Sequence, residues 1–311
     1  MTNPVAATDK PGILLTGATG YVGGLLLPRL LHRCAAVRCL VRDPARFVAA
    51  PGVEVAKGDV LEPASLDAAL AGIETAYYLV HLMASSRRFE DDDRQAARNF
   101  AAAASKAGVR RIIYLGGLGD ESDPRLSPHL RSRHEVGRVL AETGVQVIEF
   151  RASIVIGAGS FSFELIRTLT NRLPLMIFPR WLGTPVQPIA VDDVLEYLLA
   201  AMDLPPGPSR VFEVGSPDVT SYGGLIREYA RQTGKWRVLI PVPVLTPYLS
   251  SLWLSLVTPT RAEVGRILIE GLRNPMVVKD MSARQVFATR PVTVAQAVQQ
   301  ALAPGVKGRV G

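Results

Sequence analysis

The nonapeptide SPHLRSRHE, residues 127–135, contains two of the four histidines of the chain and two arginines. His129 and Arg133 are four positions apart, so on a helix they would lie on one face. An imidazole exchanges a proton near neutral pH, whereas a guanidinium stays protonated and donates several hydrogen bonds. The pair could therefore combine proton transfer with the binding of hydroxyl or phosphate oxygens.

The same nonapeptide also has a purely structural interpretation, as a solvated helix start. Ser127 would cap the helix, and Pro128 would occupy its first turn. Arg131 and Glu135 would form an exposed pair one turn apart, and His134 would face solvent.

A second candidate site is the glycine-rich segment TGATGYVGG, which follows an apolar run and opens a helical pattern. Gly17 would make a sharp turn, Gly20 would admit the pyrophosphate of a dinucleotide, and Gly23 would allow close helix packing. The loop residues between these glycines that we expect at the cofactor are Thr19, Tyr21 and Val22. The alternative is a turn without a ligand, but the position after a first strand favours dinucleotide binding.

The end of the second predicted strand, VRCLVRDPAR, should select the cofactor. Asp43 is placed to hold the ribose hydroxyls of NAD(H). However, Pro44 makes Asp43 suited to capping the next helix, and the guanidiniums of Arg42 and Arg46 suit a 2′-phosphate. We therefore expect NADP(H) in preference to NAD(H); the alternative is that Arg42 only faces solvent.

The elements that must position these residues alternate regularly through the first half of the chain. Short β-branched runs such as GILLT, VRCLV, VEVAK, ETAYYLV and RRIIYLGG are separated by amphipathic patterns that end in glycine. This alternation predicts an α/β fold, a Rossmann-type doubly wound parallel sheet with a smaller C-terminal substrate lobe. We expect a flexible N-terminus over residues 1–10, a dinucleotide-binding core over 11–156, and a substrate-binding lobe over 157–311 that is interleaved with the core as a single structural unit.

Composition narrows the class of protein. The chain has 311 residues, 48% of them hydrophobic and 20% charged, and a formal net charge of +7. The arginines are scattered without a basic run, so we expect no nucleic-acid partner. Cys34 and Cys39 match neither a redox nor a metal motif, and the N-terminus lacks a signal-peptide pattern, so we expect a cytoplasmic protein without a metal.

The segment 238–260 carries no charge and is long enough to cross a bilayer. Its prolines, among them Pro241, Pro243 and Pro247, would interrupt a helix repeatedly. We therefore expect no stable membrane span. A segment packed over an apolar ligand pocket is favoured, and weak contact with a membrane is the alternative.

Four motifs in order and spacing, TGATGYVGG, LVRDPAR, GDVLEPASLDAALAG and RRIIYLGGLG, resemble the atypical, NmrA-like NAD(P)H-binding branch of the short-chain dehydrogenase/reductase superfamily. FRASIVIGAGS and PIAVDDVLEYL are similar to the substrate lobe of its extended and atypical members. This resemblance implies that Asp59 binds the adenine amino group beside Val60, and that Leu79, Val80 and His81 line the cofactor. The alternatives are a loop cap for Asp59 and a core histidine bonded to backbone for His81.

Active members of this superfamily use a serine after the fifth strand and a Tyr-x-x-x-Lys pair on the next helix. Here the serine position falls on Gly116 and Gly117, and the pair appears as His129 and Arg133. The resemblance implies that His129 acts as proton donor or hydrogen-bonding electrophile and that Arg133 also binds the cofactor. Asn99, which would support the active-site backbone, completes the expected catalytic set.

Two functions are compatible with these residues. The first is an NADPH-dependent reductase of a small or medium apolar, activated substrate such as a ketone, an enone or another conjugated system. The second is a catalytically inert NADP(H)-binding redox sensor or assembly protein, which would tolerate the missing serine and tyrosine. A deep apolar cavity beside the cofactor would favour the reductase, and a filled one with an exposed apolar patch would favour the sensor.

Overall fold

The computed structural model describes residues 12–34, 36–82, 88–242 and 273–303. The expected flexible N-terminus, residues 1–10, and residues 243–260 of the uncharged segment lie outside these ranges. Within them, no helix combines the length and the apolar character that crossing a membrane requires.

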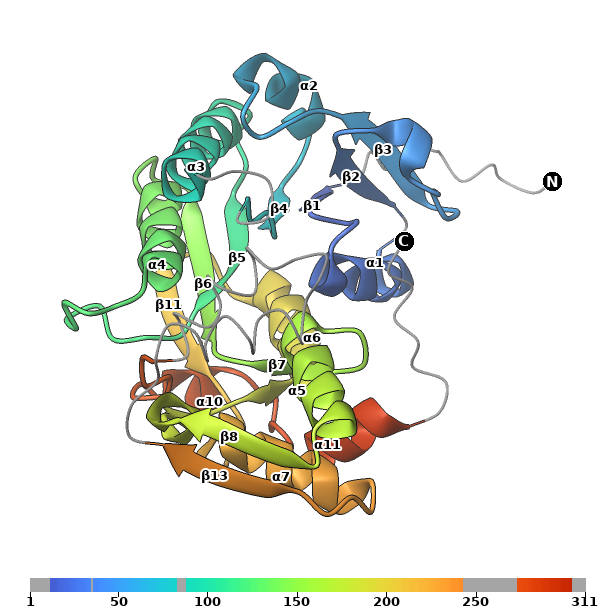
Figure 1. Ribbon diagram of the computed structural model, residues 1–311. Helices are drawn as coiled ribbons and strands as arrows, with labels where there is room; N and C mark the ends of the chain where they lie inside the picture. Colours follow the sequence, from blue (N-terminus) through green and yellow to red (C-terminus); the bar gives the residue numbers. More distant parts are fainter. Residues whose placement is uncertain (1–11, 35, 83–87, 243–272, 304–311) are drawn as a thin grey trace.

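A seven-stranded sheet forms the centre of the molecule (Figure 1), and its strands run in the order β11-β6-β5-β4-β1-β2-β3. Every neighbouring pair is parallel. The strands are β1 (Ile13–Thr16), β2 (Val37–Val41), β3 (Val53–Lys57), β4 (Thr75–Tyr78), β5 (Arg111–Gly117), β6 (Gln146–Ala152) and β11 (Arg210–Val214). The predicted fold class, a Rossmann-type doubly wound parallel sheet, is confirmed.

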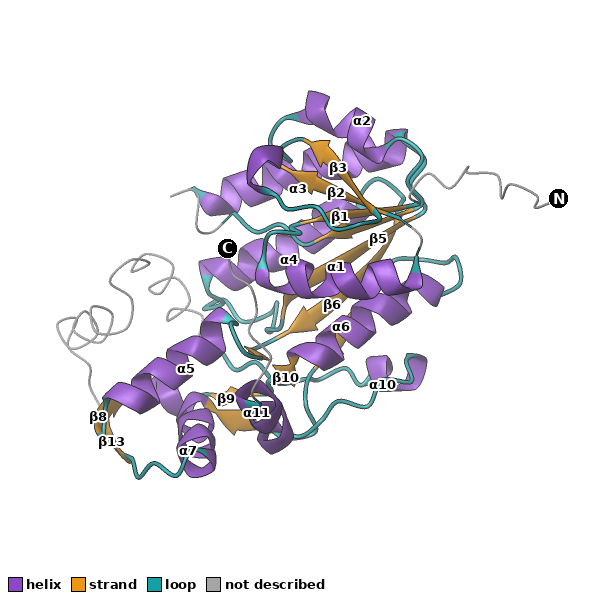
Figure 2. Cartoon of the chain, turned by 90° about the vertical axis from the view of Figure 1, so that its right-hand side faces the viewer, coloured by secondary structure: helices purple, strands orange, loops and turns teal. Residues whose placement is uncertain are grey.

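Helices cover both faces of this sheet (Figure 2). One face packs against α1 (Tyr21–Arg33) and α6 (Val191–Ala200), and the other against α2 (Leu66–Leu70), α3 (Phe89–Lys106) and α4 (Pro128–Ala141). Successive strand residues point to opposite faces, so Leu15 joins the α1/α6 core and Leu14 joins the α2/α3/α4 core. This is why the strands read as continuous apolar runs.

The smaller lobe is built around a third core. Its elements are β7 (Val155–Ile156), α5 (Phe161–Arg172), β8 (Leu175–Pro179), β9 (Pro185–Val186), β10 (Ile189–Ala190), β12 (Thr220–Ser221), α7 (Tyr222–Gln232), β13 (Val238–Val242) and α11 (Val294–Leu302). The short helix α10 (Ser282–Val286) packs instead beside β11 in the α1/α6 core. The chain crosses between the two parts more than once, because α6 and β11 follow residue 157 and belong to the main sheet and its helical layer.

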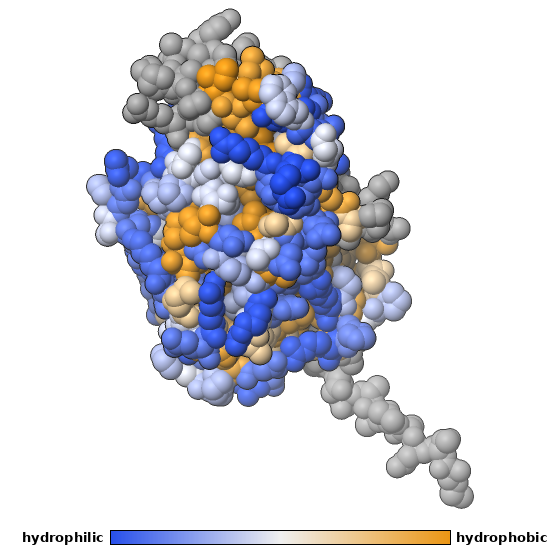
Figure 3. Space-filling model, turned by 90° about the horizontal axis from the view of Figure 1, so that it is seen from below, coloured by the Kyte–Doolittle hydropathy of each residue, from blue (hydrophilic) through white to orange (hydrophobic). Residues whose placement is uncertain are grey.

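The face of the molecule seen in Figure 3 is mostly hydrophilic, with apolar patches between the polar side chains. The two-stranded sheet of β8 and β13 contributes exposed hydrophobic residues to the lobe surface, because Leu175 and Ile240 are about half exposed, and Trp236 lies just before β13 and is 79% exposed. An apolar surface of this kind is a feature of contact sites.

The order of the strands determines where a ligand fits. Strand order reverses between β1 and β4, and in open α/β sheets ligands bind outside the carboxyl ends of the strands at this switch point. The glycine-rich segment follows β1, and residues 79–81 follow β4. The fold therefore brings these two predicted parts of the site together.

Candidate functional site

The glycine loop is held between the end of β4 and the start of α1. Gly17 has a φ of +72°, and a Cβ atom there would lie 2.5 Å from the carbonyl oxygen of Leu79. A Cβ atom at Gly23 would lie 2.2 Å from the carbonyl oxygen of Gly17. Both positions therefore exclude any larger residue. Thr16 links the end of β1 to the end of β4, since its hydroxyl donates to the Tyr77 carbonyl (2.9 Å) and accepts from the Leu79 amide (3.0 Å).

The first turn of α1 leaves its amides available to an anion. Gly20 is the N-cap residue, so no side chain caps the helix, and the first turn, Tyr21 and Val22 included, holds no acidic residue. Unpaired amides and the helix dipole favour a phosphate at such an end. Thr19 is exposed in the same loop. The Tyr21 hydroxyl is buried without a hydrogen-bond partner.

At the end of β2, Arg42 and Arg46 are both exposed. The Asp43 carboxylate accepts a hydrogen bond from the Ala45 amide (3.1 Å) and caps the short 3₁₀ turn Pro44–Arg46. The expected capping role of Asp43 is therefore confirmed. Its carboxylate is engaged with its own turn, whereas the two guanidiniums are exposed to solvent.

The loop after β3 is supported by Asn99 of α3. The Asn99 side-chain amide donates to the Val60 carbonyl (2.9 Å), across 39 residues of sequence. Asp59 accepts from the Leu61 amide (2.9 Å), so it does act as a loop cap, which still leaves its second carboxylate oxygen for a ligand. Asn99 thus supports backbone beside the expected adenine position and does not touch His129 or Arg133 through any hydrogen bond that the described residues form.

The end of β4 carries the centre of a buried polar network. The Nδ1 atom of His81 lies 3.0 Å from Asp93 Oδ2, and its Nε2 atom lies 3.1 Å from Nδ1 of His129. The alternative of a core histidine bonded to backbone is thus wrong, because both ring nitrogens face side chains. Leu79 and Val80 lie just before it, between the glycine loop and this network.

Asp93 comes from α3 and was not predicted. Besides His81, it accepts from the Leu82 amide (2.9 Å) and the Ser132 hydroxyl (2.9 Å), and only 3% of its side chain is exposed. Burial raises its pKa, but the hydrogen bonds from His81 and Leu82 outweigh this and hold the pKa below the usual value. Helix periodicity in the sequence indicates that Asp93 is buried, since it lies one turn before the apolar residues Ala96 and Ala97 on the same face of α3.

Burial lowers the pKa of both histidines. The shift is larger for His129, where His81 and the Arg133 guanidinium add to the effect of burial. For His81 the hydrogen bond with Asp93 opposes the shift. Neutral imidazole is therefore favoured in this pair, and any proton that it takes up is stabilised on the side of Asp93.

Arg133 has an unused hydrogen-bond donor. Its Nη2 atom donates to the Leu115 carbonyl, and its guanidinium lies 4.8 Å from the centre of the Tyr114 ring. Its Nη1 atom is buried without a partner. A buried cationic donor without an acceptor is costly, so this atom suits a ribose hydroxyl or a phosphate that a bound dinucleotide would bring.

Gly116 and Gly117, where the resemblance places a serine, lie close to neighbouring side chains. A Cβ atom on Gly117 would lie 2.8 Å from Cδ2 of Leu130, and one on Gly116 would lie 2.8 Å from the Glu149 carboxylate. A serine at either position would therefore require the end of the Leu130 or the Glu149 side chain to shift. His129 and Arg133 instead border a cavity of about 130 Å³, which is also lined by Ser153, Ser162, Tyr222 and Met276. Ser153 donates to the Gln187 carbonyl (2.6 Å), and neither serine was predicted.

The structural interpretation of SPHLRSRHE is only partly right. Ser127 caps α4, with Pro128 in the first turn. However, Arg131 faces Glu90 (3.6 Å), and Glu135 pairs with Arg94 (2.5 Å), so the two do not pair with each other. His134 is also not solvent-facing.

His134 is 2% exposed, and its Nε2 lies 2.9 Å from the Gly117 carbonyl oxygen. The Gly117 carbonyl at the end of β5, Glu121 in the following loop (3.6 Å) and Arg151 of β6 lie around this ring, so a position that a lone helix would expose is buried. Burial and the nearby Arg151 lower the pKa of His134 to about 4.

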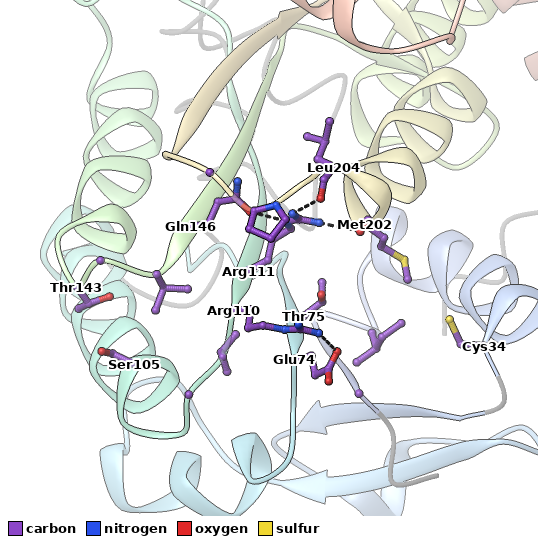
Figure 4. Close-up of a pocket in the computed structure, with 18 of the residues that line it drawn as sticks. Cys34, Glu74, Thr75, Ser105, Arg110, Arg111, Thr143, Gln146, Met202 and Leu204 are labelled. Atoms are coloured by element: carbon purple, nitrogen blue, oxygen red, sulfur yellow. Dashed lines mark hydrogen bonds and ion pairs between the residues drawn. The ribbon is translucent and has the colours of Figure 1, made fainter.

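The larger cavity of about 950 Å³ lies at the opposite, amino-terminal edge of the sheet (Figure 4). Its guanidiniums are already engaged. Arg111 donates to the carbonyls of Ala201 and Met202, and Arg110 pairs with Glu74. The Thr143 hydroxyl in this groove is buried without a hydrogen-bond partner. The two cavities therefore differ in their guanidiniums, because those of the groove are engaged and Arg133 at the carboxyl edge keeps a free donor.

These features define the class of protein as one with a Rossmann-type nucleotide site, and comparison with known proteins agrees. Residues 17–153 match the family model described as NAD(P)H-binding, so this part of the chain is an NAD(P)H-binding domain. The expected resemblance is confirmed at the level of this domain and of the fold.

Among proteins of known activity, the chain is 32% identical to an NAD(P)H azoreductase of Xenophilus azovorans over 139 residues, 44% of this chain and 43% of that one. It is 30% identical to a 3-beta-hydroxysteroid dehydrogenase of Mycolicibacterium neoaurum over 145 residues, 40% of each. The matches thus span less than half the length of these relatives.

Solved structures share the fold over nearly the whole chain. A triphenylmethane reductase of Citrobacter sp., complexed with NADP(H), has a TM-score of 0.74 at 19% identity and covers 93% of this chain and 99% of that one. The NADPH-dependent quinone oxidoreductase QOR2 of Escherichia coli, complexed with NADPH, has a TM-score of 0.68 at 19% identity, covering 94% and 100%.

Proposed function

We propose that this protein is an NADPH-dependent reductase of a small or medium apolar substrate with an activated acceptor, such as a ketone, an enone or another conjugated system. The observation that carries the proposal is the placement of His129 and Arg133. They lie on one face of α4 and border a cavity at the carboxyl edge of the sheet, close to the switch point where an NAD(P)H-binding domain holds its cofactor.

Different residues bind different parts of the dinucleotide. The glycine loop and the first-turn amides of α1 hold the pyrophosphate, and Asp59 holds the adenine amino group. Arg42, with Arg46, holds the 2′-phosphate and so favours NADP(H) over NAD(H). The free Nη1 of Arg133 binds the nicotinamide ribose. A bound nicotinamide supplies the hydride.

The substrate atom that becomes negatively charged needs a proton or a hydrogen bond, and His129 provides it. Its ring lines the cavity beside the glycines that end β5, and none of the described residues that line this cavity carries a carboxylate. The remaining lining is mainly small or apolar, which suits an uncharged, conjugated acceptor.

A second candidate is a catalytically inert NADP(H)-binding sensor. Two observations favour it: the cavity beside His129 holds only about 130 Å³, and Leu175, Trp236 and Ile240 are exposed on the lobe. The described residues that line the cavity leave room for a small ring or less, whereas an exposed apolar surface suits a protein partner.

Titration with NADPH and NADH, followed by turnover assays, separates these functions. Azo dyes, triphenylmethane dyes and quinones are the acceptors to try first, because proteins of similar sequence or fold are named for them. Turnover that His129→Gln reduces roughly a hundredfold, with NADPH affinity retained, supports the reductase. NADPH binding without turnover of any acceptor supports the sensor, and no dinucleotide binding at all contradicts both.

A further inference from the structure

The chain Asp93–His81–His129 connects the interior of the protein to the cavity at the carboxyl edge. The three residues come from α3, the end of β4 and the first turn of α4, and they are joined by contacts of 3.0 and 3.1 Å. The two imidazole rings lie 5.0 Å apart between centroids. Only His129 borders the cavity.

The hydrogen-bond partners determine which ring nitrogens carry protons. Asp93 accepts from the Leu82 amide and the Ser132 hydroxyl, and its pKa is held below the usual value, so its carboxylate is ionised and can only accept. Nδ1 of His81 is therefore the donor to Asp93. In the neutral pair, Nε2 of His81 is then an acceptor, so Nδ1 of His129 must carry the proton of the 3.1 Å contact. Nε2 of His129 is left with a lone pair.

One added proton reverses this arrangement. His81 then carries protons on both nitrogens, donating to Asp93 from Nδ1 and to Nδ1 of His129 from Nε2. Since His129 remains neutral, its own proton is on Nε2, where it can be donated. The positive charge lies on His81, next to the carboxylate.

We propose that Asp93 and His81 are positioning residues that turn His129 into a proton donor with a defined tautomer, so that the three side chains form a proton relay. In reduction, the proton on Nε2 of His129 passes to the substrate heteroatom, and the N–H electron pair stays on the ring. The proton on Nε2 of His81 moves to Nδ1 of His129, and both rings end neutral. A bound reduced nicotinamide would supply the hydride that the substrate gains together with this proton. Solvent reprotonates the pair before the next turnover.

The charged and titratable groups around the pair set the direction of its pH response. Asp93 on α3 favours the protonated pair, whereas Arg133 and His134 on α4 disfavour it. Reduction should therefore slow as pH rises through the apparent pKa of the pair, and oxidation by the neutral pair should respond in the opposite sense. This inference rests on the proposed function for its chemistry, but the tautomers can be tested without it.

The first experiment is ¹⁵N NMR of the histidine rings in the full-length, cofactor-free protein. The chain has only four histidines, and His32→Gln, His81→Gln, His129→Gln and His134→Gln assign them. At about pH 8, above the usual imidazole pKa, we expect both His81 and His129 to carry the proton on Nδ1. A proton on Nε2 of His129 in the neutral pair would overturn the relay.

The second experiment compares Asp93→Asn with Asp91→Asn. Asp91 is an exposed carboxylate on the same helix that pairs with Arg94. Loss of the Asp93 charge should lower the apparent pKa of the reduction profile by about one unit, and so lower the rate above that pKa about tenfold. Asp93→Glu should restore part of the profile, and Asp91→Asn should leave it unchanged.

The outcomes separate the relay from the proposed function. If the Asp93→Asn variant folds, binds NADPH and reduces the acceptor with an unchanged pH profile, Asp93 has only a structural role. That result contradicts the relay and leaves the proposed reductase function supported. If no acceptor is reduced, the reductase fails, and the NMR tautomers decide whether the relay geometry exists.

Discussion

The two edges of the central sheet each present arginines and a cavity, but they differ in what is left unpaired. At the amino edge, Arg111 donates to four backbone carbonyls between Ala201 and Pro205 and to Gln146. At the carboxyl edge, Arg133 donates to one carbonyl and keeps a buried Nη1 free. The larger cavity belongs to the edge with the satisfied arginine. An unpaired cationic donor, and not volume, therefore distinguishes the carboxyl edge among the described residues.

The largest effect that this contrast predicts concerns glycines. Gly17→Ala should weaken NADPH binding by at least about a hundredfold, because a Cβ atom 2.5 Å from the Leu79 carbonyl must displace the loop. Gly144 lines the amino-edge groove, has a φ of +81° and has no atom within 4 Å of an added Cβ. Gly144→Ala should cost about 1 kcal/mol of stability through its φ alone and leave the affinity unchanged. NADPH affinity is measured by isothermal titration calorimetry. Equal losses of affinity in Gly17→Ala and Gly144→Ala would contradict the proposed difference between the two edges.

Next in size is a pH effect on stability. The unfolded chain binds a proton at His134 near the usual imidazole pKa of about 6.5, whereas the folded protein does so only at about 4. Burial of neutral His134 therefore costs no stability above about pH 6.5, and the protein loses stability as pH falls from there towards 4. His134→Gln should reduce this loss by about 3 kcal/mol at pH 4, measured by urea unfolding across that window. An unchanged slope in the variant would mean that His134 is not the group responsible.

The arginines themselves give a matched pair of variants. Arg133→Met should weaken NADPH binding roughly tenfold, the lower end of what a hydrogen bond from a charged group contributes. Arg133→Lys should keep much of the affinity, since an ammonium can also donate to a ribose hydroxyl. Arg111→Met should lower the unfolding midpoint and leave the affinity of the folded protein unchanged. A loss of affinity in Arg111→Met would assign a ligand to the amino edge.

The smallest effect is on cofactor choice. Arg42→Ala should weaken NADPH roughly fivefold and leave NADH unchanged, because an exposed guanidinium gains less from a phosphate than a buried one. Arg110, exposed at the other edge and paired with Glu74, supplies the control, and Arg110→Ala should alter neither affinity. If Arg42→Ala weakens both dinucleotides equally, the preference for NADP(H) lies elsewhere.

Much of the fold was predictable because its signals are local. The apolar runs, the glycine loop and the Ser127 cap depend on neighbouring residues, and each was found where the sequence placed it. The burial of His134 was missed because a single helix shows which residues share a face, and not which neighbour will cover that face. The pairs that Arg131 and Glu135 form with α3 were missed for the same reason.

The candidate site likewise has parts that the sequence predicted and parts that depend on the packing of separate elements. The sequence by itself determined the α/β architecture, the glycine loop after β1, and the placement of His129 and Arg133 on one helix face, because each is a matter of residue type and short spacing. Only the tertiary structure decided that His81 meets His129 across 48 residues, that Asp93 holds the pair from a third element, and that Arg133 keeps a free donor. These relations depend on how α3 and α4 pack beside the carboxyl ends of β4 and β5, and no periodicity within a single element encodes that packing.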